Sequence, residues 1–126
     1  MTFDPSARPV AFLFVGDRDR ALAFYTGVLG LTLKSSDGFG DFLELGGEGL
    51  LRMTVNPDHK PTGHPVLGWN VTDIAAAVAT LAERGVAMIH YEGMGQDAAG
   101  VWTGPDGTKV AFFGDADGNV LTVSEA

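Results

Sequence analysis

An internal repeat constrains the fold of this chain more than any other feature of its sequence. Val15-Gly16-Asp17 matches Val71-Thr72-Asp73 at an offset of 56 residues, and Gly30 matches Gly85 after a slip of one residue. A chain of 126 residues has room for about one compact domain. Internal similarity of this length indicates two copies of one supersecondary unit, each of which needs a neighbour to bury its sheet face. We therefore expect a single domain made of two half-modules.

The first copy begins with a strand and a helix. Pro9–Val15 is a nearly continuous apolar run, which is typical of a strand covered on both faces. Apolar residues then recur at helical spacing over 17–29, with Asp17 as the N-cap and Gly30 as the residue that ends the helix. Glycine-containing turns separate three further predicted strands, at 31–35, 39–45 and 50–55.

The second copy repeats this order. Pro65–Val71 is predicted to be a strand and Asp73–Arg84 a helix, with Ile74, Val78 and Leu81 on one face and Gly85 after its end. The sequence thus predicts an α+β domain over 1–126, with module 1 at about 8–56, a proline-containing linker at about 57–64 and module 2 at about 65–126. Further strands are expected at 86–91, 109–113 and 120–124, and Trp102 in a short strand that pairs with 109–113.

Charge and composition exclude several classes of function. The net charge of −8 and the lack of a Lys and Arg cluster disfavour nucleic acid and anionic membrane surfaces as partners. The chain has no cysteine, so disulfides, a thiolate nucleophile and thiolate metal ligands are excluded. It also lacks a secretory leader pattern and any run of about 18 apolar residues, so we expect a soluble, cytoplasmic protein.

Four segments of the sequence together carry a family resemblance. In order and spacing they are similar to the vicinal oxygen chelate superfamily, the group of glyoxalases, bleomycin resistance proteins and extradiol dioxygenases. The resemblance implies two βαβββ modules whose eight strands form a cupped, mostly antiparallel sheet around a central site, with helices on the outside. The segments are Val15–Tyr25, Val28–Leu31, Val71–Ile74 and Asp115–Asn119.

The family resemblance also implies where a metal would be held. Enzymes of the superfamily chelate a divalent ion through one residue on each of four strands. The corresponding positions here are Val10, Arg52, Val66 and Thr122, and none of them supplies an imidazole nitrogen or a carboxylate oxygen. We therefore expect a relative that holds neither a metal nor another cofactor.

Residues that share strand parity with those four positions should line the cup. They form an apolar floor with a few polar groups, which is typical of a small-molecule pocket. In the alternative interpretation, Phe12 and Phe14 are ordinary core residues. Trp102, Tyr91 and Met94 flank a glycine-rich loop and are expected to cover a ligand. The expected lining residues are Val10, Phe12, Phe14, Arg52, Thr54, Val66, Gly68, Asn70, Val120, Thr122 and Ser124.

Arg52 is the most informative of these residues. A cation among Val and Phe side chains has a desolvation cost unless it is paired, so we expect a ligand carboxylate or an internal acid such as Glu44 beside it. In the alternative, a register shift leaves Arg52 on the rim of the cup. The three histidines are interpreted as solvated loop residues, because His59, His64 and His90 show no convergent spacing.

Two functions remain open at this point. The first is a metal-free, homodimeric binding protein that takes a small, partly apolar molecule, with Arg52 and Asn70 as polar anchors. The second is a lyase, isomerase or dioxygenase-like enzyme that acts on a small carbonyl or aromatic substrate. In that case Tyr25, Tyr91, Glu44 or Arg52 would assist proton transfer or polarise the substrate.

Overall fold

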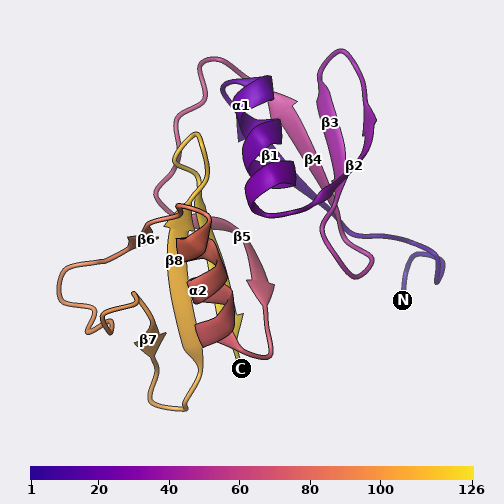
Figure 1. Cartoon of the computed structure of the whole chain (residues 1–126). Coiled ribbons are helices and arrows are strands. Elements are labelled where there is room, and N and C mark those ends of the chain that lie inside the picture. Colours follow the sequence, from indigo (N-terminus) through magenta and orange to yellow (C-terminus); the bar gives the residue numbers. More distant parts are fainter. The chain divides into compact units, whose positions relative to one another are not determined.

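The structure, a computed structural model, describes residues 1–126 and divides them into two compact units (Figure 1). Unit 1 is Met1–His59 and unit 2 is Lys60–Ala126. Each unit combines one sheet with helical segments, which confirms the α+β class and the duplicated module. The strands are hydrogen-bonded as two separate sheets of four and five strands, whereas one eight-stranded sheet was expected.

The sheet of unit 1 has four strands in the order β1-β4-β3-β2. β1 is parallel to β4, and the pairs β2/β3 and β3/β4 are antiparallel. The register places Phe12 opposite Arg52 and Arg52 opposite Phe42, so these three residues form one row across the sheet. The strands are β1 (Val10–Val15), β2 (Thr32–Ser36), β3 (Gly40–Glu44) and β4 (Leu50–Val55).

The helical segment of unit 1 begins as an α-helix and continues as a π-helix. Its parts are α1 (Arg18–Leu22) and η1 (Ala23–Val28). Asp17 caps its start as expected, since Asp17 Oδ1 accepts a hydrogen bond from Arg20 N at 2.9 Å. Leu29 N donates to Phe24 O at 3.0 Å, which is the five-residue spacing of a π-helix. The predicted α-helix over 17–29 is therefore wrong for its second half.

The sheet of unit 2 follows the order β5-β9-β8-β6, and β7 also pairs with β8. β5 is parallel to β9, and the other pairs are antiparallel. The pairing of Trp102 with Val110 confirms the short strand predicted at Trp102. The strands are β5 (Pro65–Asn70), β6 (Met88–Ile89), β7 (Trp102–Thr103), β8 (Lys109–Gly114) and β9 (Val120–Glu125).

β6 is shorter than the strand predicted over 86–91, and a side chain explains its early end. Gln96 Oε1 accepts from Tyr91 N at 2.6 Å, and Gln96 Nε2 donates to Ile89 O at 2.9 Å. The same Nε2 donates to Gly100 O at 2.8 Å. Gln96 thus takes the backbone groups with which the strand would have continued.

Helix α2 (Ile74–Glu83) covers one face of the unit 2 sheet and follows the prediction closely. Asp73 Oδ1 accepts from Ala76 N at 3.0 Å, which satisfies one of the free N–H groups at the helix start. Ile74, Val78 and Leu81 are buried, and the helix contacts β8 and β9. Gly85 follows the helix with a φ of +84°, a left-handed conformation that glycine adopts without strain.

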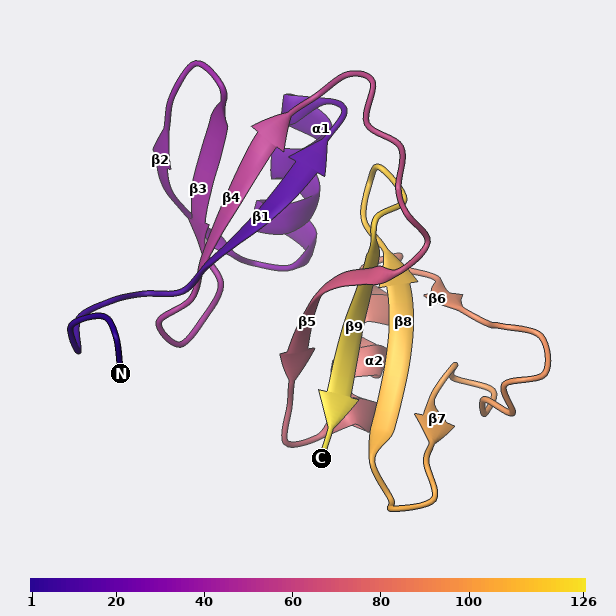
Figure 2. The same cartoon turned by 180° about the vertical axis from the view of Figure 1, so that it is seen from behind.

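Each sheet has one face under its own helix and one face free of helices. In Figure 2 the strands of unit 1 lie in front of α1, and within unit 2 the strands β5, β9 and β8 lie in front of α2. On β1 the side chains alternate: Leu13 and Val15 are 6% and 1% exposed, but Phe12 and Phe14 are 77% and 51% exposed. The prediction that β1 is covered on both faces is therefore wrong, and Phe12 and Phe14 are not core residues. No helix of the chain has the length and apolar character to span a membrane.

Candidate functional site

The face of the unit 1 sheet opposite α1 and η1, called here the open face of unit 1, collects the predicted residues of the first module. Val10, Phe12 and Phe14 alternate along β1 on this face. The parallel register sets Phe12 beside Arg52 and Phe14 beside Thr54. The register therefore puts these five residues on one face of the sheet, with Arg52 on the inner strand β4.

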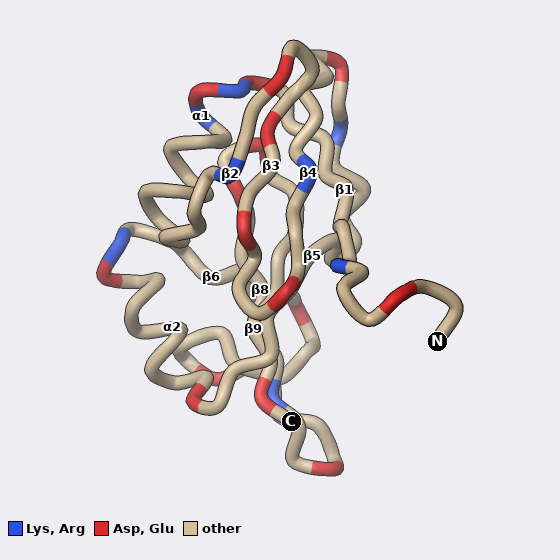
Figure 3. Tube along the Cα trace, turned by 90° about the vertical axis from the view of Figure 1, so that its right-hand side faces the viewer, with Lys and Arg blue, Asp and Glu red and all other residues tan.

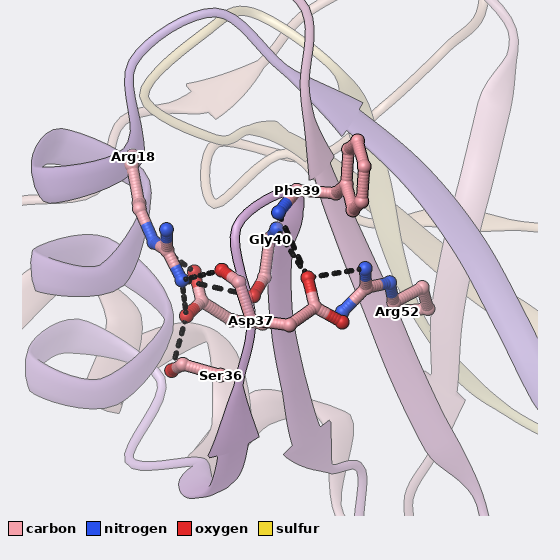
Figure 4. A network of polar contacts seen from close by, with 7 residues as sticks. Arg18, Ser36, Asp37, Phe39, Gly40 and Arg52 are labelled. Atoms are coloured by element: carbon pink, nitrogen blue, oxygen red, sulfur yellow. Dashed lines mark hydrogen bonds and ion pairs between the residues drawn. The ribbon is translucent and has the colours of Figure 1, made fainter.

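Arg52 is enclosed although it projects from an exposed face. Its side chain is only 11% exposed, and its guanidinium carbon lies 4.8 Å from the centroid of the Phe42 ring, a distance at which the cation is attracted to the ring face. Arg52 Nη2 donates to Asp37 Oδ1 at 2.8 Å (Figure 4). Arg52 Nη1 is buried and has no hydrogen-bond partner. One strong donor of the site thus has no hydrogen-bond acceptor within the chain.

The acid that pairs with Arg52 is Asp37, in the turn between β2 and β3, and not Glu44. Besides the bond from Arg52, Asp37 Oδ1 accepts from Phe39 N at 2.8 Å and from Gly40 N at 3.1 Å. The Arg52 hydrogen bond, followed by the backbone bond from Phe39, lowers the pKa of Asp37 from 3.8 to about 2. Asp37 therefore carries its charge at neutral pH. Glu44 pairs instead with Arg8, which explains why the expected Glu44 contact is absent.

A second arginine holds the same turn from the other face of the sheet. Arg18, at the start of α1, donates from Nη2 to the carbonyl oxygens of Asp37 and Gly40, both at 2.9 Å (Figure 4). It also binds the carboxylate of Asp41, at 2.8 Å from Nη2 and 3.1 Å from Nε. Asp41 is 1% exposed and accepts a further bond from Ser36 Oγ at 2.5 Å. The position of Asp37, and through it that of Arg52, is thus fixed by the covered face of the sheet.

Sequence reasoning missed Asp37 and Phe42 as parts of this site. Phe42 has the strand parity of Arg52, so parity along β3 was a usable signal. Asp37 gave a weaker signal, a turn aspartate before a glycine, because such residues usually bond only to their own turn. His59 was also misjudged: it is half-buried, with its ring centroid 5.9 Å from that of Phe14, so it is not a solvated loop residue.

The open face of unit 2 collects the predicted residues of the second module. In its central row Gly68 lies beside Thr122, and Thr122 beside Phe112. A Cβ atom on Gly68 would lie 2.1 Å from Thr122 Oγ1, so this hydroxyl occupies the space beside the glycine. Asn70 Nδ2 donates to Ser124 Oγ at 3.1 Å. Val66 is exposed and Trp102 half-buried in this unit.

Phe112 is a further aromatic residue of unit 2 that sequence reasoning did not single out. The Tyr91 ring stands edge-on to it, with 5.2 Å between centroids and an interplanar angle of 89°. Tyr91 itself is 39% exposed. The two rings provide unit 2 with an aromatic surface of its own.

Within unit 1, the groups considered for catalysis have contacts other than Arg52. Tyr25 is fully buried on the covered side of unit 1, where its ring stands edge-on to Phe24 at 5.2 Å. Glu44 is engaged by Arg8, and Tyr91 belongs to unit 2. No observed contact therefore favours proton transfer at this site.

The donor set does not suit the divalent metal that the family resemblance implies. Two of the four positions are valines, Thr122 offers one hydroxyl, and Arg52 is a cation held against Asp37. The chain contains no group of three or more His, Cys, Asp or Glu side chains arranged to hold a metal ion. The side chains at these four positions therefore do not form the metal site of the superfamily.

Comparisons with known proteins agree with this fold. Residues 8–123 match the family model of the Glyoxalase/Bleomycin resistance protein/Dioxygenase superfamily. A glyoxalase/bleomycin resistance protein from Catenulispora acidiphila DSM 44928 is 26% identical, with a TM-score of 0.68 over 94% of this chain and 97% of that chain. A superfamily member from Sphaerobacter thermophilus DSM 20745 is 24% identical, with a TM-score of 0.71 over 95% and 97%.

A third solved structure is TnmS3, an antibiotic binding protein from Streptomyces sp. CB03234. It is 24% identical, with a TM-score of 0.69 over 99% of this chain and 98% of that chain. No curated protein sequence matches the chain. The family match spans both modules and nearly the whole chain. The protein belongs to the glyoxalase/bleomycin resistance protein/dioxygenase superfamily.

Proposed function

We propose that this protein is a metal-free binding protein that takes a small, partly apolar molecule on the open face of unit 1, with Arg52 as the polar anchor. The observation that carries the proposal is the buried Nη1 of Arg52, which has no hydrogen-bond partner. A buried donor without a partner costs about 1–3 kcal/mol, and a ligand oxygen in the right place removes that cost.

The apolar part of the ligand has a surface to cover. Phe12 and Phe14 are 77% and 51% exposed beside Arg52, and covering such rings contributes about 25 cal/mol per Å² of apolar area removed from water. Because Nη1 itself is buried, a ligand oxygen reaches it only when a neighbouring side chain moves. Phe12 is the direct cross-strand neighbour of Arg52 and, as an exposed ring, has little packing to lose.

Two further points support binding over catalysis. The four positions at which the superfamily holds its metal lack imidazole and carboxylate groups in this chain. A protein with the same fold, TnmS3, is an antibiotic binding protein, so the fold is compatible with such a role. The enzymatic alternative has no comparable observation in its favour, because Tyr25 is fully buried and Glu44 is engaged by Arg8.

The test is a titration of ¹⁵N-labelled protein with antibiotics, aromatic amides, aromatic acids and glutathione adducts. We expect shifts at the amides of β1 and β4 and at the Arg52 Nε–H signal. Phe12→Ser should weaken binding at least about tenfold, as the loss of one covered ring is worth about 1.5–3 kcal/mol. Phe3→Ser is the matched control, because Phe3 is 68% exposed in the N-terminal segment of the same unit.

Two results would contradict the proposal. One is a stoichiometric divalent ion in the purified protein, measured by mass spectrometry of its metal content. The other is an equal effect of Phe12→Ser and Phe3→Ser on every ligand that binds.

We also propose that the protein forms a homodimer. β1 and β5 each stand at one edge of their own sheet, and a second copy can cover such an edge. Sedimentation equilibrium should give about 26 kDa, twice the 13.2 kDa of one chain, and a monomer at micromolar concentration would contradict this part of the proposal.

A further inference from the structure

The charge of the Arg52 site limits the kind of ligand that it can take. Arg52 is 2.8 Å from the ionised carboxylate of Asp37, so the two charges cancel locally. Beside them on the open face, Arg8 and Glu44 form a second neutral pair, which the exposed Lys34 approaches. Unit 1 as a whole has five Lys and Arg and eight Asp and Glu, a net charge of −3 (Figure 3). The Arg52–Asp37 pair therefore offers a free hydrogen-bond donor but no uncompensated positive charge of its own.

From this arrangement, and on the basis of the function proposed above, we infer that the open face of unit 1 binds neutral aromatic molecules that carry a carbonyl or amide oxygen, and that Asp37 makes it discriminate against carboxylates. A neutral oxygen satisfies Nη1 and leaves the Arg52–Asp37 pair intact. A carboxylate would bring a second negative charge to a cation that already has one. Its repulsion by Asp37 at about 4–5 Å, about 1–4 kcal/mol, offsets most of its attraction to Arg52, so the cost of taking its charge out of water is not compensated. This replaces the sequence-based expectation of a ligand carboxylate.

The aromatic part of the inference comes from the rings around the free donor. Arg52 rests on Phe42, and Phe12 lies beside it on the opposite neighbouring strand. Phe14 continues the same face and has the His59 ring next to it. Aromatic rings attract one another edge-on or offset, so a flat ring with an attached oxygen matches both parts of the site.

Asp37→Asn is a clean test of the role of charge. An asparagine oxygen can still accept the backbone bonds from Phe39 and Gly40 that Asp37 Oδ1 accepts now. Arg18 holds the turn through the main-chain carbonyls of residues 37 and 40, which the substitution does not change. The variant should therefore keep the turn and lose only the negative charge beside Arg52.

The experiment compares 2-naphthamide with 2-naphthoate, two probes of nearly equal shape that differ in charge. Calorimetry at pH 7 and low salt gives the affinities, and the Arg52 Nε–H signal reports the site. We expect the wild type to bind the amide at least about fivefold more tightly than naphthoate. Asp37→Asn should raise the affinity for naphthoate by at least about fivefold and change the affinity for the amide by less than about twofold. Asp19→Asn, an equal charge change at an exposed position of α1, should alter neither affinity.

The possible failures are distinguishable. Tighter binding of naphthoate than of the amide by the wild type, or no gain for naphthoate in Asp37→Asn, would overturn the inference about charge and leave the binding function standing. If neither probe moves the Arg52 signal in either protein at millimolar concentration, both the inference and the proposed binding function at this site are refuted.

Discussion

Gly68 and Thr122 offer a quantitative test of the packing between β5 and β9. The Cβ atom that Gly68→Ala introduces would lie 2.1 Å from Thr122 Oγ1, far inside the 3.0 Å below which a neighbouring atom must move. The next atoms, Thr122 O and Cβ, would lie at 3.2 and 3.4 Å, so the hydroxyl is the principal obstacle. Removal of that hydroxyl by Thr122→Ala should make room for the new methyl group.

The expected free energies follow from this geometry. Gly68→Ala alone should lower the free energy of unfolding by about 1–3 kcal/mol, the usual cost of an extra methyl group in packed surroundings. Thr122→Ala alone, at a half-buried strand position, should cost about 1 kcal/mol or less. The double variant should be more stable than Gly68→Ala by up to about 2 kcal/mol, because the clash is gone, while the effect of the new alanine on the unfolded chain is the same in both variants.

Urea denaturation followed by tryptophan fluorescence suits this cycle, because both tryptophans, Trp69 and Trp102, lie in unit 2 and Trp69 is next to the altered residue. A coupling energy below about 0.3 kcal/mol, or a double variant less stable than Gly68→Ala, would refute the reasoning. Gly40→Ala is the contrasting case: its Cβ would lie 1.8 Å from the main-chain oxygen of Met53, and Met53→Ala should give no rescue.

Three further predictions concern the remaining polar contacts. Arg18→Met should lower the free energy of unfolding by about 3–5 kcal/mol, because it leaves the 1% exposed carboxylate of Asp41 without its charged partner. Asp41→Asn should lower it by about 1–3 kcal/mol, because Arg18 is 33% exposed and water can solvate it. Urea denaturation followed by circular dichroism should show this inequality, and equal costs would contradict it. The lowered pKa of Asp37, about 2 against 3.8, means that its ion pair stabilises the fold above about pH 4 and is lost as the pH falls towards 2. In Asp37→Asn the free energy of unfolding should therefore fall less steeply between about pH 4 and about pH 2 than in the wild type. An unchanged pH dependence would contradict a stabilising role of the ion pair. Gln96→Ala should speed amide hydrogen exchange at Tyr91, whose N–H loses its acceptor, while the amides of β9 stay protected. A uniform change in exchange across unit 2 would show that Gln96 does not act locally.

The elements that could be predicted from the sequence are those fixed by local signals. Helix α2 has a capping aspartate, a helical apolar stripe and a terminal glycine, and all three have the expected roles. The π-helical turn was not predictable, because the apolar stripe fits an α-helix and the Thr26 hydroxyl bond to Leu22 O has an equivalent in the α-helix α2, from Thr80 to Ala76 O. The early end of β6 depends on a side chain, Gln96, that lies outside the strand.

The candidate site likewise has a part that was predictable from the sequence and a part that was not. Strand parity placed Arg52 on the face of Phe12 and Phe14, because alternation along a strand is a local property. The partner of Arg52 was not predictable, because Asp37 reaches it from a turn 15 residues away whose shape depends on Arg18. An unsatisfied Nη1 is a property of that complete arrangement and has no signal in the sequence.

The turn over residues 36–40 has a consequence for changes in chain length. Arg18 and Arg52 donate hydrogen bonds to this turn from opposite faces of the sheet. An inserted residue would move apart their acceptors, which are the main-chain oxygens of residues 37 and 40 and the Asp37 carboxylate. The turn between β7 and β8 is different, since its bonds from Gly104 N to Thr108 O and from Gly107 N to Gly104 O run within the turn itself. A grafted peptide or an affinity tag therefore belongs at the exposed residues 105–107, and the length of the β2–β3 hairpin is fixed.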